Sequence, residues 1–267
     1  MAESRTKELS TIPAGRLGVV AHKSCEELGK EVDKWLVKWR KERESEHKDT
    51  LSFEGYERDT YLIENEVPRF GSGEAKGVIK ESVRGDDLYF MVDVCNHSMT
   101  YPLQGNTIVN YMSPDDHFQD LKRLIAAASG KAKRMNVIMP YLYEGRVSLR
   151  GDRESLDCAS ALQELVDMGV ENIITFDAHD VRVQNATPLY GLETVRPAYQ
   201  FVKALFGEVE DIEIDKDKLM IISPDRGGMD RAIYLATVLH VNMGMFYKRR
   251  SIEDVKNAQA GETAGAE

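Results

Sequence analysis

Carboxylates and a histidine follow two short apolar runs of the sequence, where they could hold a metal-bound phosphate. Asp177 and His179 follow an Ile-rich run at 171–176, and Asp225 follows a second run at 219–222. Such runs are typical of strands buried on both faces of a parallel sheet, and open α/β sheets bind ligands outside the carboxyl ends of their strands. The alternative is that these residues cap helices and line turns. The two segments alone favour neither interpretation.

Three further polar segments could complete a site for a nucleotide. Arg146 and Arg150 follow an apolar run at 136–139, a Gly-rich turn spans 70–74, and basic residues at 248–250 follow the last apolar run. Guanidinium and ammonium groups stabilise the charge of a transferring phosphoryl group, and an arginine can stack on a base. Together with carboxylates, which suit a hard divalent cation, these residues predict a Mg-nucleotide site.

The common glycine-rich nucleotide signatures are absent from the sequence. Gly71, Gly73 and Gly77 miss the spacing of the dinucleotide-binding fingerprint by one residue, and they precede a strand pattern rather than a helix. No Walker A sequence occurs either. A nucleotide bound by this chain would therefore be held without a P-loop.

The elements that must position these residues follow from the hydrophobic periodicity. Short apolar runs predict strands, and amphipathic segments predict helices. The expected strands cover 17–21, 77–83, 87–94, 136–139, 171–176, 219–222 and 243–247, and the expected helices cover 24–39, 113–128, 154–168, 195–206 and 228–240. Because strands alternate with helices, the sequence predicts an α/β fold with mostly parallel sheets.

The helix expected at 113–128 begins with a cluster that has two interpretations. Ser113 is a favourable N-cap, Pro114 suits the first helical position, and Asp115 and Asp116 suit the first turn. The same acids could form a metal cluster with His117. Compensation of the helix dipole explains them better.

Charge and cysteine content argue against several classes of protein. The chain has 267 residues, a net charge of −10 and no dominant basic segment, which argues against nucleic-acid binding. Cys25, Cys95 and Cys158 are odd in number and lack metal-site spacing, as in reduced cytosolic proteins. No apolar run approaches the length of a membrane span. The sequence therefore predicts a cytoplasmic protein without a nucleic-acid or membrane partner.

The order of the polar segments resembles that of the ribose-phosphate pyrophosphokinase (PRPP synthetase) family. The resemblance covers roughly residues 15 to 250. Its motifs include Arg-Phe-Gly-Ser-Gly-Glu at 69–74, Glu-Ser-Val-Arg-Gly-Asp-Asp at 81–87, Phe-Asp-Ala-His at 176–179, Ser-Pro-Asp-x-Gly-Gly at 223–228 and Lys-Arg-Arg at 248–250. The segments at 112–123 and 153–158 are similar to a longer bacterial branch of the family.

The resemblance implies a fold of two phosphoribosyltransferase-like α/β domains, assembly into a homo-oligomer, and Mg²⁺ as the cofactor. It also implies that the protein binds ATP and ribose 5-phosphate. The reaction would transfer the pyrophosphoryl group of Mg-ATP to the C1 hydroxyl of the sugar, giving AMP and phosphoribosyl pyrophosphate (PRPP) for nucleotide biosynthesis. Such a transfer depends on positioning and on charge stabilisation.

The matching motif positions assign a role to individual residues, as an implication of the resemblance. Lys248 and Arg250 match the catalytic basic pair. The positions that match ATP contacts are Phe70, Glu74, Arg146 and His179. Metal contacts match His179, Asp177 and Asp225, and the ribose-phosphate side matches Asp225, Gly227 and Gly228.

The resemblance also divides the chain. Residues 1–150 are expected to form an N-terminal α/β domain, 151–250 the first part of an incomplete second domain, and 251–267 a disordered tail. The segment with which the family binds ribose 5-phosphate has no counterpart in 251–267. The sequence therefore leaves two functions open: a PRPP synthetase, or a catalytically incompetent regulatory or truncated relative that associates with a complete synthetase.

Overall fold

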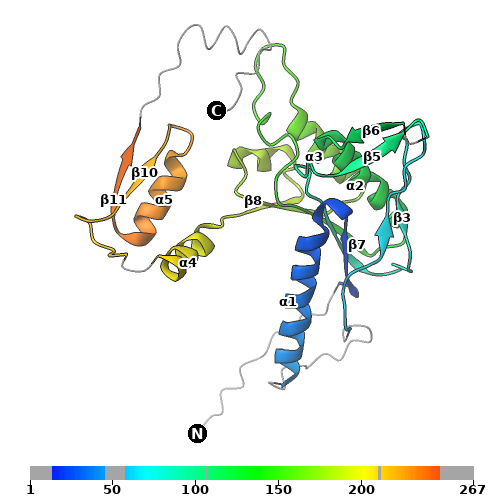
Figure 1. The fold of residues 1–267 in the computed structure, drawn as a ribbon, viewed down its shortest axis with the longest axis horizontal. Coiled ribbons are helices and arrows are strands. Elements are labelled where there is room, and N and C mark those ends of the chain that lie inside the picture. The colour runs from blue at the N-terminus through cyan, green and yellow to red at the C-terminus, as the bar shows by residue number, and fades with distance from the viewer. Residues whose placement is uncertain (1–13, 46–57, 106, 210–211, 247–267) are drawn as a thin grey trace. The chain divides into compact units, whose positions relative to one another are not determined.

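Two compact units make up the protein in a computed structural model (Figure 1). The structure describes residues 14–45, 58–105, 107–209 and 212–246. The first unit is Met1–Arg196 and the second is Pro197–Glu267. The tail expected at 251–267 lies outside the described residues.

A five-stranded parallel sheet forms the centre of the first unit. Its strands lie in the order β1-β4-β7-β8-β9. They are β1 (Leu17–Ala21), β4 (Asp87–Met91), β7 (Arg134–Met139), β8 (Asn172–Phe176) and β9 (Gly191–Val195). The structure confirms the parallel arrangement and the first four of these strands.

Alternate side chains of the strands enter two separate cores, one on each face of the sheet. The helices of this unit are η1 (Lys23–Cys25), α1 (Glu26–Ser45), α2 (Pro114–Ala128), α3 (Asp157–Asp167) and η2 (Val181–Ala186). On one face, Val20, Phe90 and Val137 pack with apolar side chains of α2 and α3. On the other face, Val19 and Met91 pack with α1. Burial on both faces explains the continuous apolar runs of the strands.

Helix α2 begins in the way that the sequence predicts. The Ser113 hydroxyl accepts a hydrogen bond from the Asp116 backbone N–H at 3.1 Å, and the Asp116 carboxylate accepts one from the Ser113 N–H at 3.0 Å. Pro114 is the first helical residue. His117 is buried, and its Nε2 donates to the Asn96 carbonyl at 2.8 Å. The acids therefore serve the helix terminus, and His117 points into the protein.

Some elements of the first unit differ from the prediction. An antiparallel hairpin joins β5 (Thr100–Leu103) to β6 (Ile108–Tyr111), and neither strand was expected. β9 was also not expected, and it takes up the first residue of the helix predicted at 195–206. The strand expected at 77–83 is reduced to β3 (Val78–Ile79), which pairs with β2 (Asn65–Glu66), because the chain turns before β4.

The second unit contains a parallel pair of strands connected by a helix. Its elements are α4 (Ala198–Glu208), β10 (Met220–Ser223), α5 (Met229–Leu239) and β11 (Asn242–Met245). α5 buries Ala232, Ala236 and Leu239. The structure confirms the predicted order of strand, helix and strand, and the helix expected at 195–206 begins three residues later, at Ala198.

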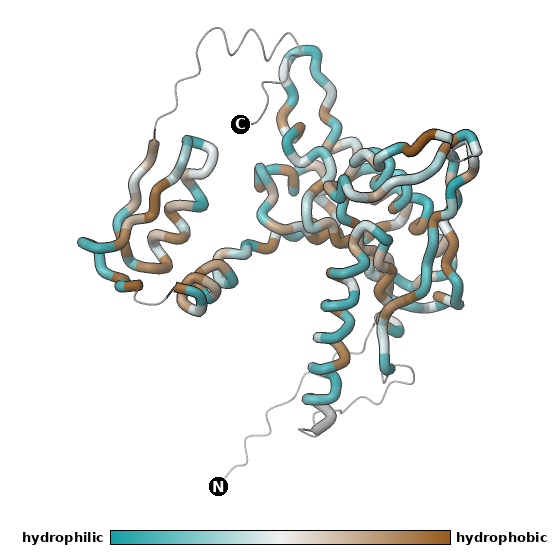
Figure 2. The backbone as a smooth tube through the Cα atoms, in the orientation of Figure 1, coloured by the Kyte–Doolittle hydropathy of each residue, from teal (hydrophilic) through white to brown (hydrophobic). Residues whose placement is uncertain are grey.

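The first unit extends to Arg196, because β8 and β9 pair with the sheet that begins at β1, and the division of the chain into domains at residue 150 stays a prediction. Within the described ranges, no helix combines the length and apolar character needed to cross a bilayer. The longest described helix, α1, is largely hydrophilic along its length (Figure 2).

Candidate functional site

The loops that follow β4, β7 and β8 leave the same edge of the sheet, because these neighbouring strands are parallel. They carry Asp93 and Cys95, then Arg146, then Asp177 and His179. Cys95 in the first loop is close enough to Arg146 in the second loop to feel its charge, so these two loops lie near each other. Burial raises the pKa of the Cys95 thiol, Asp93 raises it further, and Arg146 opposes them.

Tyr143 anchors the loop that presents Arg146. Its ring stacks on Phe118 of α2 with ring centroids 4.2 Å apart, and its hydroxyl donates to Asp115 at 2.6 Å. Burial and that carboxylate raise the pKa of Tyr143. Arg146 itself is exposed, so its guanidinium extends from a fixed loop into solvent.

The segment after β8 presents Asp177 in a strained conformation. Asp177 has φ of 43°, in the left-handed region that costs a non-glycine residue about 1 kcal/mol or more. Its N–H donates to the Val195 carbonyl at 3.0 Å, and the Ala178 N–H donates to Thr194 Oγ1 at 2.9 Å. β9 therefore holds this turn, and the exposed His179 follows it.

The Asp180 carboxylate forms an ion pair with Arg182. Arg182 Nη2 donates to its carboxylate at 2.6 Å, and these hydrogen bonds lower the pKa of Asp180 to about 2. Asp180 also accepts a bond from the Arg182 backbone N–H at the start of η2. Asp177 and His179 are the two residues of this segment for which the resemblance implies contact with a ligand.

Mg²⁺ would find a partial set of donors at this edge of the sheet. The ion usually keeps several waters and is bound by one or two carboxylates together with substrate phosphates. Asp177 can supply such a carboxylate. No cluster of three or more His, Cys, Asp and Glu side chains suited to a metal occurs in the part of the chain that the structure describes. These donors therefore suit a Mg²⁺ ion whose other ligands are substrate phosphates, rather than a Mg²⁺ ion coordinated by protein side chains alone.

The turn at 70–74 is closed by its own backbone. The Phe70 N–H donates to the Glu74 carbonyl at 2.7 Å, and the Gly73 N–H donates to the Phe70 carbonyl at 2.8 Å. Phe70 is 53% exposed, and the Ser72 hydroxyl donates to Glu74 Oε2 at 2.8 Å. The turn thus presents an aromatic ring and an oriented carboxylate.

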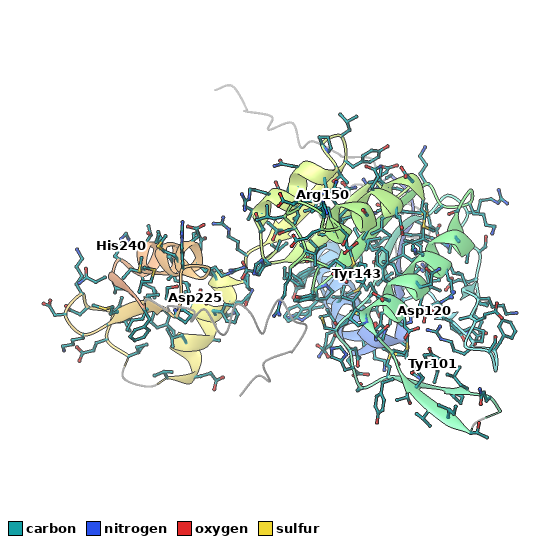
Figure 3. The ribbon with its side chains drawn as sticks, turned by 90° about the horizontal axis from the view of Figure 1, so that it is seen from above. Tyr101, Asp120, Tyr143, Arg150, Asp225 and His240 are labelled. Atoms are coloured by element: carbon teal, nitrogen blue, oxygen red, sulfur yellow. The ribbon has the colours of Figure 1, made fainter. Side chains whose placement is uncertain are left out.

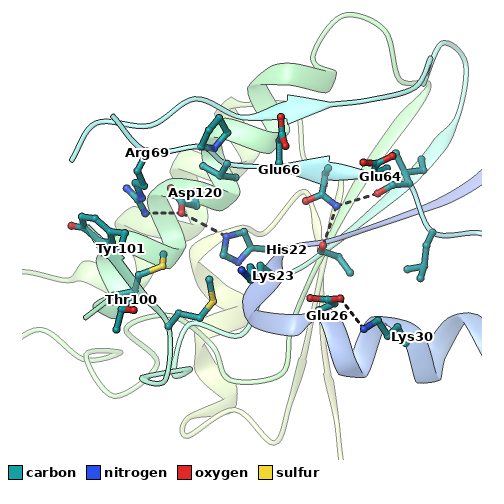
Figure 4. Close-up of a pocket in the computed structure, with 18 of the residues that line it drawn as sticks. His22, Lys23, Glu26, Lys30, Glu64, Glu66, Arg69, Thr100, Tyr101 and Asp120 are labelled. Atoms are coloured by element: carbon teal, nitrogen blue, oxygen red, sulfur yellow. Dashed lines mark hydrogen bonds and ion pairs between the residues drawn. The ribbon is translucent and has the colours of Figure 1, made fainter. Parts of the chain in front are cut away.

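The sequence analysis did not single out the buried charged cluster behind this turn. Arg69 donates to Asp120 at 2.7 Å, Arg123 donates to the same carboxylate at 2.6 Å, and His22 Nε2 lies 3.6 Å from it. His22, Arg69 and Asp120 line a cavity of about 630 Å³ (Figure 4). The sequence offers no local signal for this cluster, because Arg69 and Asp120 lie 51 residues apart in the chain.

In the second unit, Asp225 shapes a turn between β10 and α5 (Figure 3). Its Oδ1 accepts a hydrogen bond from the Gly228 N–H at 3.0 Å, and its carbonyl accepts one from the Ser223 hydroxyl at 2.7 Å. A Cβ at Gly228 would lie 2.9 Å from Ser223 Oγ, so a larger residue there would displace the Ser223 hydroxyl. With Gly227, this turn leads into a helix N-terminus, where backbone N–H groups favour anions.

The predicted basic pair cannot be placed. Lys248 and Arg250 lie outside the described residues. Arg146, Asp177 and His179 lie at one edge of the first unit, Phe70 and Glu74 lie in a turn of that unit, and Asp225, Gly227 and Gly228 lie together in the second. The roles assigned to all of these residues stay predictions.

Comparison with known proteins identifies the family. A family model described as the N-terminal domain of ribose phosphate pyrophosphokinase matches residues 17–169, more than half of the chain. A ribose-phosphate pyrophosphokinase of Bacillus caldolyticus is 28% identical over 206 residues, which cover 74% of this chain and 57% of that protein. A putative ribose-phosphate pyrophosphokinase 1 of Enterococcus faecalis is 30% identical over 192 residues, covering 70% and 52%.

A solved structure shares the fold. The crystal structure of phosphoribosylpyrophosphate synthetase from Mycobacterium smegmatis superposes with a TM-score of 0.66 at 21% identity, covering 88% of this chain and 65% of that one. The chain spans about half the length of the curated relatives that it matches. Because the family model matches more than half of the chain, we conclude that the chain belongs to the ribose-phosphate pyrophosphokinase family.

Proposed function

We propose that the protein is a ribose-phosphate diphosphokinase, which transfers the pyrophosphoryl group of Mg-ATP to ribose 5-phosphate and releases AMP. The observation that carries the proposal is the shared sheet edge from which Arg146, Asp177 and His179 extend, in a chain that belongs to this family. Ligands of open α/β sheets bind at that edge.

The residues of the first unit would bind the nucleotide. Phe70 offers an exposed ring on which adenine can stack, and Glu74 offers an acceptor beside it. Arg146 would contact the phosphates, and His179 and Asp177 would meet the phosphates and the metal. A bound Mg²⁺ would supply charge neutralisation on the phosphate oxygens.

The second unit would bind the acceptor sugar. Gly227 and Gly228, which carry no side chain, would let the backbone of the turn approach the 5-phosphate, and Asp225 would hold the turn through its hydrogen bond from the Gly228 N–H. Lys248 and Arg250 would stabilise the charge that develops as the C1 hydroxyl oxygen attacks the β-phosphorus. We further propose that this unit is the first part of a second phosphoribosyltransferase-like domain, and that the active protein is a homo-oligomer.

Release of AMP from Mg-ATP, with and without ribose 5-phosphate, tests the proposal on the purified 267-residue chain. We expect AMP release that depends on the sugar. Lys248→Ala should lose this turnover while it retains nucleotide binding, because the side chain acts mainly in the transition state. Equal losses of turnover and binding would contradict that role.

Nucleotide binding separates the two functions that the sequence leaves open. We expect calorimetry to show Mg-dependent ATP binding that His179→Ala weakens, and unchanged binding in this variant would refute the placement of His179. A chain that binds Mg-ATP without sugar-dependent AMP release would instead be the catalytically incompetent relative.

A further inference from the structure

We infer that Arg69 is a positioning residue that holds the turn at 70–74 in a conformation ready for a nucleotide. The inference rests on the proposed function, since Phe70 and Glu74 belong to the proposed nucleotide site. Neither residue contacts α2 through its own hydrogen bonds in the structure, and Arg69 provides that connection.

The Arg69 guanidinium joins three elements. Its Nη1 donates to the Gly73 carbonyl of the turn at 3.3 Å, and its Nη2 donates to Asp120 of α2 at 2.7 Å. Its central carbon lies 4.5 Å from the centroid of the Tyr101 ring in β5. Figure 4 shows the Arg69 guanidinium joined to the Asp120 carboxylate, with the Tyr101 ring on the Arg69 side of this pair. One side chain therefore ties the turn to a helix and to the hairpin.

The anchor of this connection is buried. The side chain of Arg69 is 9% exposed and that of Asp120 is 3% exposed. Asp120 is fixed independently by Arg123, which donates to its other oxygen at 2.6 Å. Because a buried carboxylate with two guanidinium partners has little freedom to move, Asp120 gives Arg69 a fixed point of attachment.

The hairpin supports the turn from a second direction. The Gln104 N–H donates to the Gly71 carbonyl at 2.9 Å. Gly73 has φ of 92°, and a Cβ there would lie 3.0 Å from Leu103 Cδ2. The Tyr101 hydroxyl accepts from Asn110 at 2.7 Å, which orients the ring that lies beside Arg69. The turn is therefore held by contacts other than those it makes with itself.

Pre-organisation of this turn would matter for affinity. Phe70 is 53% exposed, although its backbone is fixed by the turn. A ligand that stacks on this ring does not have to order the segment, so less binding free energy is lost. If the fraction of protein with a competent turn falls to about a tenth, the apparent dissociation constant rises about tenfold.

Arg69→Lys is the variant that tests the inference. The ammonium group can still neutralise Asp120, so the fold should survive, but it lacks the planar fork that reaches Gly73 and Asp120 together. We expect the dissociation constant for Mg-ATP to rise about tenfold in calorimetry. We also expect faster hydrogen exchange of the Gly73 amide. In a Phe70→Ala background, the same substitution should change affinity much less, because both act through the turn.

Arg134→Lys is a matched control. Arg134 also donates through a fork, from Nε and Nη2, to a buried carboxylate, that of Asp87. This pair lies at the start of β4 and β7, at the opposite edge of the sheet from the proposed site. We expect Arg134→Lys to leave both Mg-ATP affinity and Gly73 exchange unchanged. Tyr101→Leu, which removes the ring beside Arg69, should resemble Arg69→Lys.

Two results would overturn the inference. The first is an Arg69→Lys variant with unchanged Mg-ATP affinity in a chain whose wild type binds. The second is an equal loss in Arg134→Lys, which would mean general destabilisation. A wild type that binds no Mg-ATP would instead contradict the proposed function. In that case Gly73 exchange would still decide whether Arg69 holds the turn.

Discussion

Asn136 lies at the centre of a buried polar network that crosses three strands of the sheet. It is 1% exposed, and its Nδ2 donates to Asp87 Oδ1 at 2.9 Å and to the Leu88 carbonyl at 3.0 Å. Its Oδ1 accepts a bond from Asn172 at 2.8 Å. Asn136→Leu is close to isosteric and removes all three bonds, so it measures what this network contributes to stability.

The expected loss can be worked out from these contacts. A hydrogen bond to a charged group contributes about 1.5–3 kcal/mol and a neutral one about 0.5–1.5 kcal/mol, so the three bonds amount to roughly 2.5–6 kcal/mol. Burial of the leucine side chain recovers about 1.5–3 kcal/mol. We therefore expect Asn136→Leu to lower the free energy of unfolding by about 2 kcal/mol, which corresponds to roughly 4–8 °C in Tm.

Urea unfolding followed by tryptophan fluorescence provides the assay. Both tryptophans, Trp35 and Trp39, lie on α1, so the signal reports the first unit. Asn110→Leu is a suitable control, because Asn110 donates one hydrogen bond, to the Tyr101 hydroxyl, outside the parallel sheet. A loss below about 1 kcal/mol for Asn136→Leu, or one equal to that of the control, would refute the reasoning.

The remaining predictions concern binding, pH dependence and thiol reactivity. Phe70→Ala should weaken Mg-ATP binding about tenfold or more in calorimetry, since base–aromatic stacking contributes about 1–3 kcal/mol; an unchanged constant would contradict the stacking role. Burial lowers the pKa of His117 below its ordinary value of 6.5, so the unfolded state takes up its proton first. Stability should therefore fall as the pH drops below about 6.5, and urea midpoints of His117→Gln should show a smaller decline. Burial raises the pKa of Cys25 to about 12 and that of Cys158 to about 11. Ellman's reagent at pH 8 should therefore label Cys95 first, and Cys95→Ser should remove the fast phase.

Sequence reasoning found the strands that are buried on both faces of the sheet. β1, β4 and β7 carry continuous apolar runs because each contributes to two cores, and the Ile-rich run of β8 contributes Ile173 to the core that contains α2 and α3. The runs of β5, β6 and β9 are interrupted by exposed or polar residues, so periodicity could not distinguish them from loops. The capping box of α2 was predictable because it depends on residues three apart.

The candidate site was predictable only where it follows from the sheet. The rule that parallel strands deliver their following residues to one edge predicted that Arg146 and His179 extend from the same edge. The link between Arg69 and Asp120 joins residues 51 apart in sequence. From the residue pattern of α2 alone, Asp120 is expected to be an ordinary polar residue beside the apolar face of the helix. Its partners depend on how α2 packs against the turn, which no local pattern encodes.

The positive φ of Asp177 has a consequence for engineering. Glycine removes the steric conflict of this conformation, which costs a non-glycine residue about 1 kcal/mol or more, so Asp177→Gly is expected to relieve the strain of this turn. A library selected only for thermostability would therefore enrich this substitution and delete the carboxylate proposed to meet the metal. Because stabilising changes accumulate most readily where function holds the backbone in an unfavourable state, a selection on this protein should pair heat resistance with retention of Mg-ATP binding.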